Sequence, residues 1–300
     1  MINIIWDERL MEYDFGPGHP LRSIRCKKGI ERLKKEEDLE YNLISPEYAE
    51  KEELALFHTL DYIKSIEENI GGSAETPVKN MYNPARLSVG ATLTAINSIT
   101  DDARISVNLC GGWHHAFENR ARGFCIFNDV VIGAKYAQKK GFSKVMIIDW
   151  DVHHGDGTQR AFLNDDSVYT ISIHQDPSTQ YPYVSGFTSE NKKTNLNIPI
   201  TPGESEQEIM TRVLSTIPNE IRFFKPEMLI IQMGVDGDMY DPMSSINLSE
   251  RFYKSISVVL ARCAKKNKFP VILLGGGGFN FPRTAELWTL IVKTFYENVK

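Results

Sequence analysis

The chain has 300 residues, and its 34 lysines and arginines are outnumbered by 39 aspartates and glutamates, which gives a formal net charge of −5. Hydrophobic residues make up 42% and charged residues 24%, proportions that exclude a disordered chain. The negative balance argues against a nucleic-acid binder that relies on bulk positive charge. No apolar run reaches the roughly 18 residues that a membrane span needs. The N-terminus, MINIIWDERL, lacks the basic start of a signal peptide.

The cysteines do not form a disulfide framework. Cys26, Cys110, Cys125 and Cys263 are few and scattered, and no CxxC occurs. We therefore expect reduced thiols and a cytoplasmic protein that has neither nucleic acid nor a membrane as a partner.

Strand-like apolar runs recur along the chain. They are Ile2–Trp6, Ile105–Leu109, Val145–Asp151, Val168–His174, Leu196–Ile200, Met228–Gly234 and Pro270–Leu274. Several are continuous rather than alternating in polarity, as in strands that are buried on both faces of a parallel sheet.

Helical patterns separate these runs. One begins at Ser45-Pro46-Glu47, one covers Asp129–Lys140, one runs from Ser249 toward Lys266, and the last opens at Thr284. Alternating strands and helices predict an α/β fold with a parallel sheet between helices. Residues 69–84 read as a loop, and no linker or repeat divides the chain, so we expect one domain over residues 1–300.

The first polar cluster stands in IIDWDVHHGDG, residues 147–157. In an extended chain Asp149, Asp151 and His153 point to the same side, where a bound cation would offset their repulsion and burial. A solvated turn is the alternative. QMGVDGDMYDP, residues 232–242, places Asp236 at the end of another strand. Because parallel strands end at one edge, Asp151, His153 and Asp236 predict a Zn²⁺ site, with Fe²⁺ or Mn²⁺ as alternatives.

A histidine pair follows the strand at Ile105–Leu109. His114 and His115 follow two glycines and suit general acid–base work beside a metal, with Asp149 and Asp156 as the spare orienting acids. A hydrogen-bonded structural pair is the alternative.

Four glycines follow the last strand in VILLGGGGFN, residues 271–280. The Lys-Ser/Thr ending of a phosphate-binding loop is missing, and so is the GxGxxG spacing. We expect the backbone around Gly277 to lie against a substrate channel, with Phe279 offered to the site.

The motifs GGWHHA, GFCIFND, IDWDVHHGDG, GVDGDMYDP and GGGGFN, in this order, resemble those of the zinc-dependent histone deacetylase family, in particular bacterial deacetylases of the acetoin-utilisation type. YDFGPGHPLRSIR (13–25) and HQDPSTQYP (174–182) fit the same family. The resemblance covers nearly the whole chain. It implies a single α/β domain with an eight-stranded parallel sheet flanked by helices, related to arginase, and hydrolysis of an N-ε-acyl-lysine or a related acylated amine.

The resemblance also implies residue roles. Asp151, His153 and Asp236 resemble the ligands of one zinc ion per chain. His115 resembles the general base that activates water, and Asp156 the acid that orients it.

Further roles carry over in the same way. His114 with Asp149 resembles a second dyad that helps the leaving amine. Gly123 and Phe124 resemble one wall of an acyl-lysine tunnel, and Tyr181 stands where the opposite wall is expected.

Two structural potassium sites are implied as well. The first resembles a set formed by the backbone oxygens of Asp149, Asp151, His153 and Ile173 with the Ser172 hydroxyl. The second resembles a set of backbone oxygens around Phe162, Asp165 and Val168.

Phe279 departs from the family pattern, which has tyrosine in GGGGYN as a hydrogen-bond donor to the scissile carbonyl. Losing one such donor costs about 10²–10³-fold in rate in a protease. The chain is then a weak deacylase, a specialist for activated acyl groups, or a variant in which the substitution was introduced to trap substrate. A catalytically poor acyl-lysine binding protein is the alternative function.

The spacing of Asp236, Asp238 and Asp241 is also similar to that of two-manganese ureohydrolases. Those enzymes place a carboxylate two residues beyond the ligand histidine, where this chain has Gly155, so a single metal is favoured. The loop before Pro84 looks short, which predicts a permissive range of acylated lysine peptides or small acylated amines.

Overall fold

One sheet of eight strands runs through the protein, and every pair of neighbouring strands is parallel. The computed structural model describes residues 1–299, so Lys300, the last residue of the predicted domain, lies outside it. The strand order is β2-β1-β3-β8-β7-β4-β5-β6. The strands are β1 (Ile2–Ile5), β2 (Tyr41–Ile44), β3 (Ile105–Asn108), β4 (Val145–Asp149), β5 (Val168–Gln175), β6 (Asn195–Ile200), β7 (Met228–Gln232) and β8 (Val271–Leu274).

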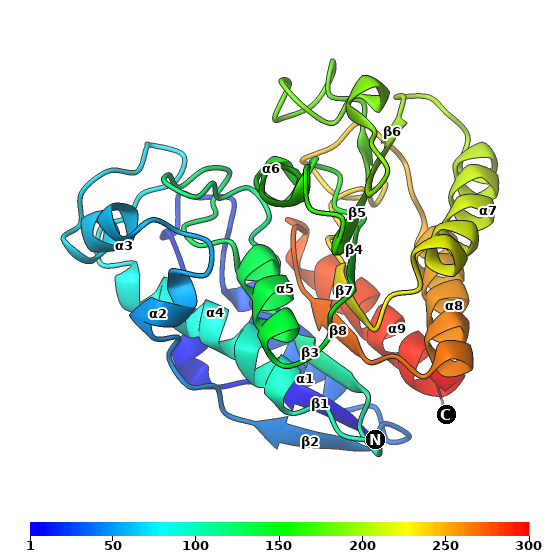
Figure 1. Ribbon diagram of the computed structural model, residues 1–300, viewed down its shortest axis with the longest axis horizontal. Helices are drawn as coiled ribbons and strands as arrows, with labels where there is room; N and C mark the ends of the chain where they lie inside the picture. The colour runs from blue at the N-terminus through cyan, green and yellow to red at the C-terminus, as the bar shows by residue number, and fades with distance from the viewer. Residues whose placement is uncertain (300) are drawn as a thin grey trace.

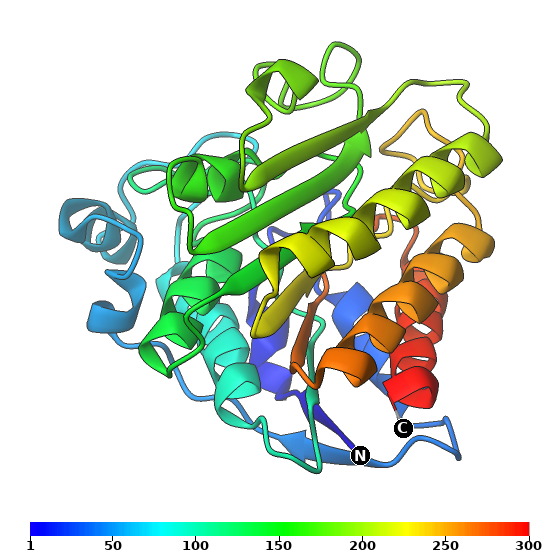
Figure 2. The same ribbon diagram turned by 45° about the vertical axis from the view of Figure 1, so that its right-hand side comes forward.

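Helices cover both faces of this sheet (Figures 1 and 2). α4 packs with α5 on one face, whereas α1, α9, α8 and α7 pack side by side, in this order, on the other. The α-helices are α1 (Ile24–Leu33), α2 (Lys51–Leu54), α3 (Leu60–Glu67), α4 (Tyr82–Asn97), α5 (Asp129–Lys139), α6 (Asp156–Phe162), α7 (Glu206–Phe224), α8 (Glu250–Asn267) and α9 (Phe281–Val299), and two short 3-10 helices are η1 (Glu8–Glu12) and η2 (Thr188–Glu190). The predicted α/β class and the eight-stranded parallel sheet are confirmed.

The seven apolar runs all form strands, because the sheet buries both faces of its central strands. Every residue of β4 and of β7 is buried. β2 escaped prediction because it is an edge strand with half-exposed and exposed residues, and so lacks a continuous apolar run. β4 and β7 end at Asp149 and Gln232, whose side chains accept the backbone N–H groups of Asp151 and Gly234 just beyond each strand.

Two predicted helix starts are wrong. The chain stays irregular after Ser45, whose hydroxyl binds the Asp7 carboxylate, while Arg9 donates to the Pro46 carbonyl. α2 begins only at Lys51, where Glu50 provides a capping box. The last helix, α9, begins at Phe281 rather than at Thr284.

The parallel arrangement brings five loops to one edge. The loops that follow β3, β8, β7, β4 and β5 start from strands that are consecutive in the sheet, so their first residues lie side by side. Across the register, Asp149 on β4 lies opposite both Ser172 on β5 and Gln232 on β7. Within residues 1–299, no helix combines the length and apolar character that crossing a membrane requires.

His58 binds the backbone at two points of the loop between β3 and α5. Its Nε2 accepts the backbone N–H of Asn128, and its Nδ1 lies 3.3 Å from the Glu118 carbonyl, so the neutral imidazole is bound at both nitrogens. Asn128 in turn caps α5 and donates its Nδ2 to the His114 and Ala116 carbonyls. The orientation of the His114 loop therefore depends on a buried, uncharged His58.

This arrangement predicts a specific acid sensitivity. Burial lowers the pKa of His58 from 6.5 to about 3, so its stabilising contribution is complete above pH 6.5 and is lost as the pH falls toward 3. The variant His58→Gln cannot titrate. We expect the melting-temperature difference between wild type and variant to shrink between pH 7.5 and pH 4.5, and a difference that stays constant would contradict a neutral His58.

Candidate active site

A cavity of about 260 Å³ opens at the carboxyl edge of the sheet. Most of the predicted catalytic, metal and tunnel residues line it, namely His114, His115, Gly123, Phe124, Asp151, His153, Tyr181, Asp236, Gly277 and Phe279. Asp149 and Asp156 do not line the cavity, but each contacts one of its histidines. The five loops thus converge on one enclosed space.

Asp151, His153 and Asp236 form the one group of three potential metal ligands within the described range 1–299. His153 Nδ1 lies 3.1 Å from Asp151 Oδ1 and 3.0 Å from Asp236 Oδ2. All three residues are buried, and their ligand atoms lie within 4.8 Å of one another. Burial and the Asp151 carboxylate raise the pKa of Asp236 to about 7, a cost that a cation between the carboxylates removes.

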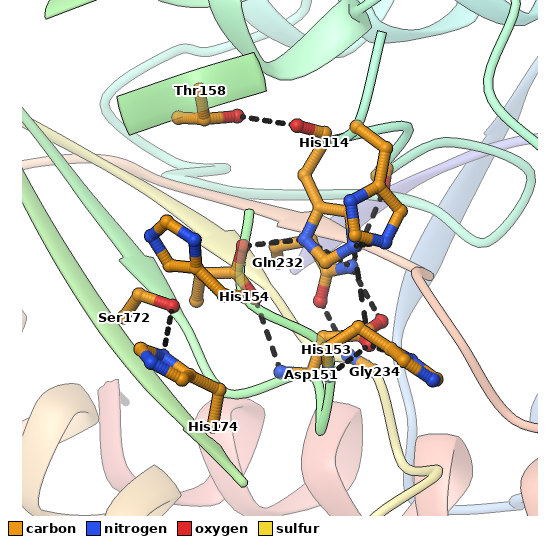
Figure 3. Close-up of polar contacts among 12 residues, drawn as sticks. His114, Asp151, His153, His154, Thr158, Ser172, His174, Gln232 and Gly234 are labelled. Atoms are coloured by element: carbon orange, nitrogen blue, oxygen red, sulfur yellow. Dashed lines mark hydrogen bonds and ion pairs between the residues drawn. The ribbon is translucent and has the colours of Figure 1, made fainter. Parts of the chain in front are cut away.

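The surroundings leave the inner ligand atoms free to face a metal. Asp151 Oδ2 accepts hydrogen bonds from Gln232 Nε2 at 2.8 Å and from the Gly277 N–H at 2.7 Å (Figure 3). Asp236 Oδ1 accepts the Val152 N–H at 2.8 Å. Each carboxylate therefore has one oxygen fixed by the protein and the other turned toward His153. An imidazole nitrogen with two carboxylate oxygens is a donor set that fits Zn²⁺ or Fe²⁺.

Glycine is required beside this cluster. A Cβ atom at Gly277 would collide with the Asp236 carboxylate, and one at Gly234 with the Asp151 carboxylate. The glycine run after β8 therefore lets the backbone reach the ligand carboxylates, whereas the sequence had predicted only a close approach to a channel.

The histidine pair forms two connected dyads. His114 Nδ1 lies 2.7 Å from Asp149 Oδ2, and His115 Nδ1 lies 2.8 Å from Asp156 Oδ1. The two Nε2 atoms face each other at 3.1 Å. These hydrogen bonds are also expected for a purely structural histidine pair, the alternative raised from the sequence. Unlike such a pair, however, both histidines line the cavity beside the candidate metal ligands.

The two histidines carry different charges near neutral pH. Burial alone would lower the pKa of His114, but the Asp149 and Asp151 carboxylates raise it to about 9. Burial and the neighbouring charge of His114 lower the pKa of His115 to about 4. The two shifts favour the proton on His114 over the proton on His115, an ordering that separates an acid from a base.

Aromatic rings form the walls of the cavity. The rings of Phe124 and Phe279 lie 6.1 Å apart, and the Tyr181 ring stands perpendicular to His115 at 4.9 Å. Gly123 and Phe124 both have positive φ, 55° and 67°, and a Cβ at Gly123 would collide with the His115 ring. Phe279 contributes no hydroxyl to this cavity.

Arg25 and Arg122 are functional candidates to which the sequence analysis gave no role. Arg25 is 1% exposed and lines the cavity, where its Nη1 donates to the Gly276 carbonyl at 2.6 Å. Its Nη2 has no hydrogen-bond partner among residues 1–299. Arg122 contacts Asp156 and Tyr181. Arg25 ends the segment YDFGPGHPLRSIR, and Arg122 directly precedes the motif GFCIFND, but the sequence does not indicate the contacts that either side chain makes.

The residues predicted to bind potassium are only partly together. Asp149 and Ser172 line one small cavity beneath the active site, and the Ser172 hydroxyl also contacts His174 Nδ1 at 2.8 Å (Figure 3). Asp151, His153 and Ile173 do not line that cavity. In the second set, the carbonyl oxygens of Phe162 and Asp165 accept the N–H groups of Asp165 and Val168. Both potassium sites stay predictions.

The second-metal alternative finds little support in the geometry. Asp238 pairs with Arg283 at 3.2 Å, and Asp241 accepts the N–H groups of Phe279 and Met243. Neither acid belongs to the cluster of metal ligands. A Cβ at Gly155 would come within 2.6 Å of Asp149 Oδ2, so no larger ligand fits there.

Comparisons with known proteins identify the family of the chain. The family model of the histone deacetylase domain matches residues 19–295. Histone deacetylase 8 of Xenopus laevis is 32% identical over 269 residues, which cover 83% of this chain and 81% of that protein. Acetoin utilization protein AcuC of Bacillus subtilis (strain 168) is 31% identical over 312 residues, covering 95% and 80%.

Solved structures show the same fold. The crystal structure of an HDAC homolog from Aquifex aeolicus superposes with a TM-score of 0.86 at 33% identity and covers 99% of this chain and 84% of that one. An HDAC homolog complexed with SAHA superposes with a TM-score of 0.87 at 32% identity, with the same coverage. The chain therefore belongs to the histone deacetylase family.

Proposed function

We propose that the protein is a metal-dependent amidohydrolase that converts an N-ε-acyl-lysine, or a related acylated amine, to the amine and a carboxylate. One observation carries this proposal: two histidines, each paired with an aspartate, lie beside a cluster of three buried potential metal ligands in one cavity with aromatic walls. Zn²⁺ is the favoured ion, at one per chain, with Fe²⁺ as the alternative. The ion would be held by Asp151, His153 and Asp236.

The chemistry that a divalent ion supplies at such a site is polarisation of the scissile carbonyl and acidification of water. His115 has the neutral form that a general base needs. Its Nδ1–H is held by Asp156, which fixes the tautomer and leaves Nε2 to take the proton of the attacking water.

His114 keeps a proton where the leaving group needs one. Its Nδ1–H donates to Asp149, and its Nε2–H points toward His115 Nε2, 3.1 Å away, so the two histidines share this proton across the pair. When the C–N bond breaks, the amine nitrogen takes a proton from this pair, and the water oxygen remains with the acyl carbon as carboxylate.

The cavity walls suit the shape of an acyl-lysine side chain. Phe124, Phe279 and Tyr181 enclose an apolar slot that fits a methylene chain with an amide at its end. At the base, the unpartnered Nη2 of the buried Arg25 offers positive charge to the carboxylate product.

Phe279 determines which acyl groups react well. Without a hydroxyl at this position the chain supplies one hydrogen-bond donor fewer to the oxygen on which charge develops. We therefore expect the zinc-loaded protein to hydrolyse a trifluoroacetyl-lysine peptide at least about tenfold faster than an acetyl-lysine peptide, because fluorine withdraws that charge through bonds.

The test compares fluorogenic peptides with each acyl group. The matched control is His115→Ala, which should slow hydrolysis of both peptides while the zinc content stays at that of the wild type. The function is excluded if neither peptide is hydrolysed, or if the His115 variant is as active as the wild type. Hydrolysis rates of free acetyl-lysine and of a long acetyl-lysine peptide, measured side by side, test the predicted permissive substrate range. A strong preference for the peptide would contradict that prediction.

The runner-up is an acyl-lysine binding protein with little activity. Phe279 favours it, because the metal ligands and the aromatic walls can bind an acylated side chain without the missing donor. Micromolar binding of both peptides without hydrolysis would select this alternative.

A further inference from the structure

Arg122 begins the turn that carries one wall of the cavity. Its N–H donates to the Cys125 carbonyl at 3.0 Å and its own carbonyl accepts the Cys125 N–H at 2.9 Å. The two residues between them, Gly123 and Phe124, both have positive φ, which is the conformation of a tight two-residue turn. The position of the Phe124 wall therefore follows the backbone of Arg122.

The guanidinium of Arg122 reaches the opposite wall. Its Nε donates to the Tyr181 hydroxyl at 2.7 Å, and its Nη2 lies 3.4 Å from the Pro182 carbonyl. Tyr181 is half-buried and belongs to the loop after β5, which is 59 positions along the chain from Arg122. This hydrogen bond is the one that the Tyr181 hydroxyl makes within residues 1–299, so it ties the two walls to each other.

The same guanidinium neutralises a catalytic candidate. Arg122 Nη1 lies 3.2 Å from Asp156 Oδ2, and the Asp156 side chain is 2% exposed. Asp156 Oδ1 is occupied by His115 and the Gly157 N–H, whereas Oδ2 has no hydrogen-bond partner in the described chain. Arg122 is thus the counter-charge of this carboxylate, and a buried carboxylate that loses its partner is strongly destabilised.

We propose that Arg122 is a positioning residue for the reaction proposed above: it fixes the separation of the two aromatic walls and holds Asp156 in the orientation that His115 requires. The inference rests on the proposed function, since it assigns the slot to an acyl group and His115 to the base. An arginine can perform both tasks at once, because its Nε donates to the Tyr181 hydroxyl while Nη1 places positive charge beside the Asp156 carboxylate. A lysine ammonium can supply the charge but lacks the planar fork that also reaches the hydroxyl.

The test separates the contact of Arg122 with Tyr181 from its contact with Asp156. It compares the variants Arg122→Lys and Arg122→Met on acetyl- and butyryl-lysine peptides. For Arg122→Met we expect kcat on the acetyl peptide to fall about tenfold or more, because Asp156 is free to turn away from His115. Its butyryl-to-acetyl ratio of kcat/KM should rise about threefold or more, because the slot widens.

For Arg122→Lys we expect most of kcat to return, because a cation remains beside Asp156, while the acyl preference stays broad. The variant Tyr181→Phe should change the acyl preference as Arg122→Met does, and the two changes should not add in the double variant. Arg120→Met is the matched control, since Arg120 is exposed, stacks on Phe117 at 4.5 Å and does not line the cavity.

A readout independent of catalysis uses the melting temperature of the metal-free protein. Arg122→Met should lower it by about 3 °C or more, and adding Asp156→Asn should restore it, because the second change removes the unpaired charge. The inference is overturned if Arg122→Met keeps the wild-type kcat and acyl preference, if Arg122→Lys is as slow as Arg122→Met, or if Asp156→Asn fails to restore stability. Absence of any wild-type hydrolysis overturns the proposed function instead, and the melting temperatures then decide whether Arg122 holds Asp156.

Discussion

Replacing Phe279 with tyrosine is expected to raise kcat/KM for an acetyl-lysine peptide by about 10²–10³-fold, which is the effect of one hydrogen-bond donor to a developing oxyanion. The geometry prepares the position for this donor. The Phe279 ring lines the cavity 6.1 Å from the Phe124 ring, and its backbone N–H is held by Asp241 Oδ2 at 2.6 Å. The added hydroxyl therefore enters a cavity whose backbone and other walls stay unchanged. Steady-state kinetics of both proteins on the same peptide measure the gain.

The gain should depend on the acyl group and on the wall that carries the hydroxyl. With a trifluoroacetyl peptide we expect a smaller gain, because that acyl group already stabilises the negative charge. Phe124→Tyr places a hydroxyl on the other wall and should give no comparable gain. Equal rates for wild type and Phe279→Tyr would show that the phenylalanine is not what limits activity.

Removal of the metal is expected to lower kcat/KM by about 10³-fold or more, since polarisation of the carbonyl by a metal ion contributes several kcal/mol to lowering the barrier. Asp236→Asn should have the same consequence, because it deletes one carboxylate from a cluster of three ligands. Metal content by elemental analysis, measured together with hydrolysis, checks both statements.

The neighbouring acid supplies the matched control. Asp238 is buried two positions from Asp236, but it pairs with Arg283 and stands outside the cluster. Asp238→Asn should therefore keep its zinc, although it loses stability. Loss of one of two metal equivalents in Asp238→Asn would favour the two-manganese alternative over the single site.

The sequence predicted the fold and the clustering of Asp151, His153 and Asp236 for the same physical reason. Strands buried on both faces appear as continuous apolar runs, and the polar residues that end them must meet at one edge of a parallel sheet. Asp151 and Asp236 lie 85 positions apart, yet strand-end reasoning placed them together. β2 was missed because an edge strand needs no such run.

Other features depend on tertiary contacts that leave no local pattern. Ser45 has the sequence of a helix cap, but its hydroxyl is bound by Asp7, and the helix begins later. Gln232 is the polar last residue of β7, close to the candidate metal ligand Asp236, yet its amide instead binds the Asp151 carboxylate. The contact of Arg122 with Tyr181 joins two loops that are far apart in the sequence, and no hydrophobic pattern in the sequence indicates that these loops meet.

We expect amide hydrolysis to require one divalent ion, held by Asp151, His153 and Asp236. The most direct measurement is a titration of the metal-free protein with Zn²⁺, in which hydrolysis of a trifluoroacetyl-lysine peptide is followed at each addition. We predict that the rate rises in proportion to added zinc and reaches a plateau at one equivalent per chain, and that Asp236→Asn shows no such rise. A rate that is already maximal without metal, or a plateau at two equivalents, would contradict the claim.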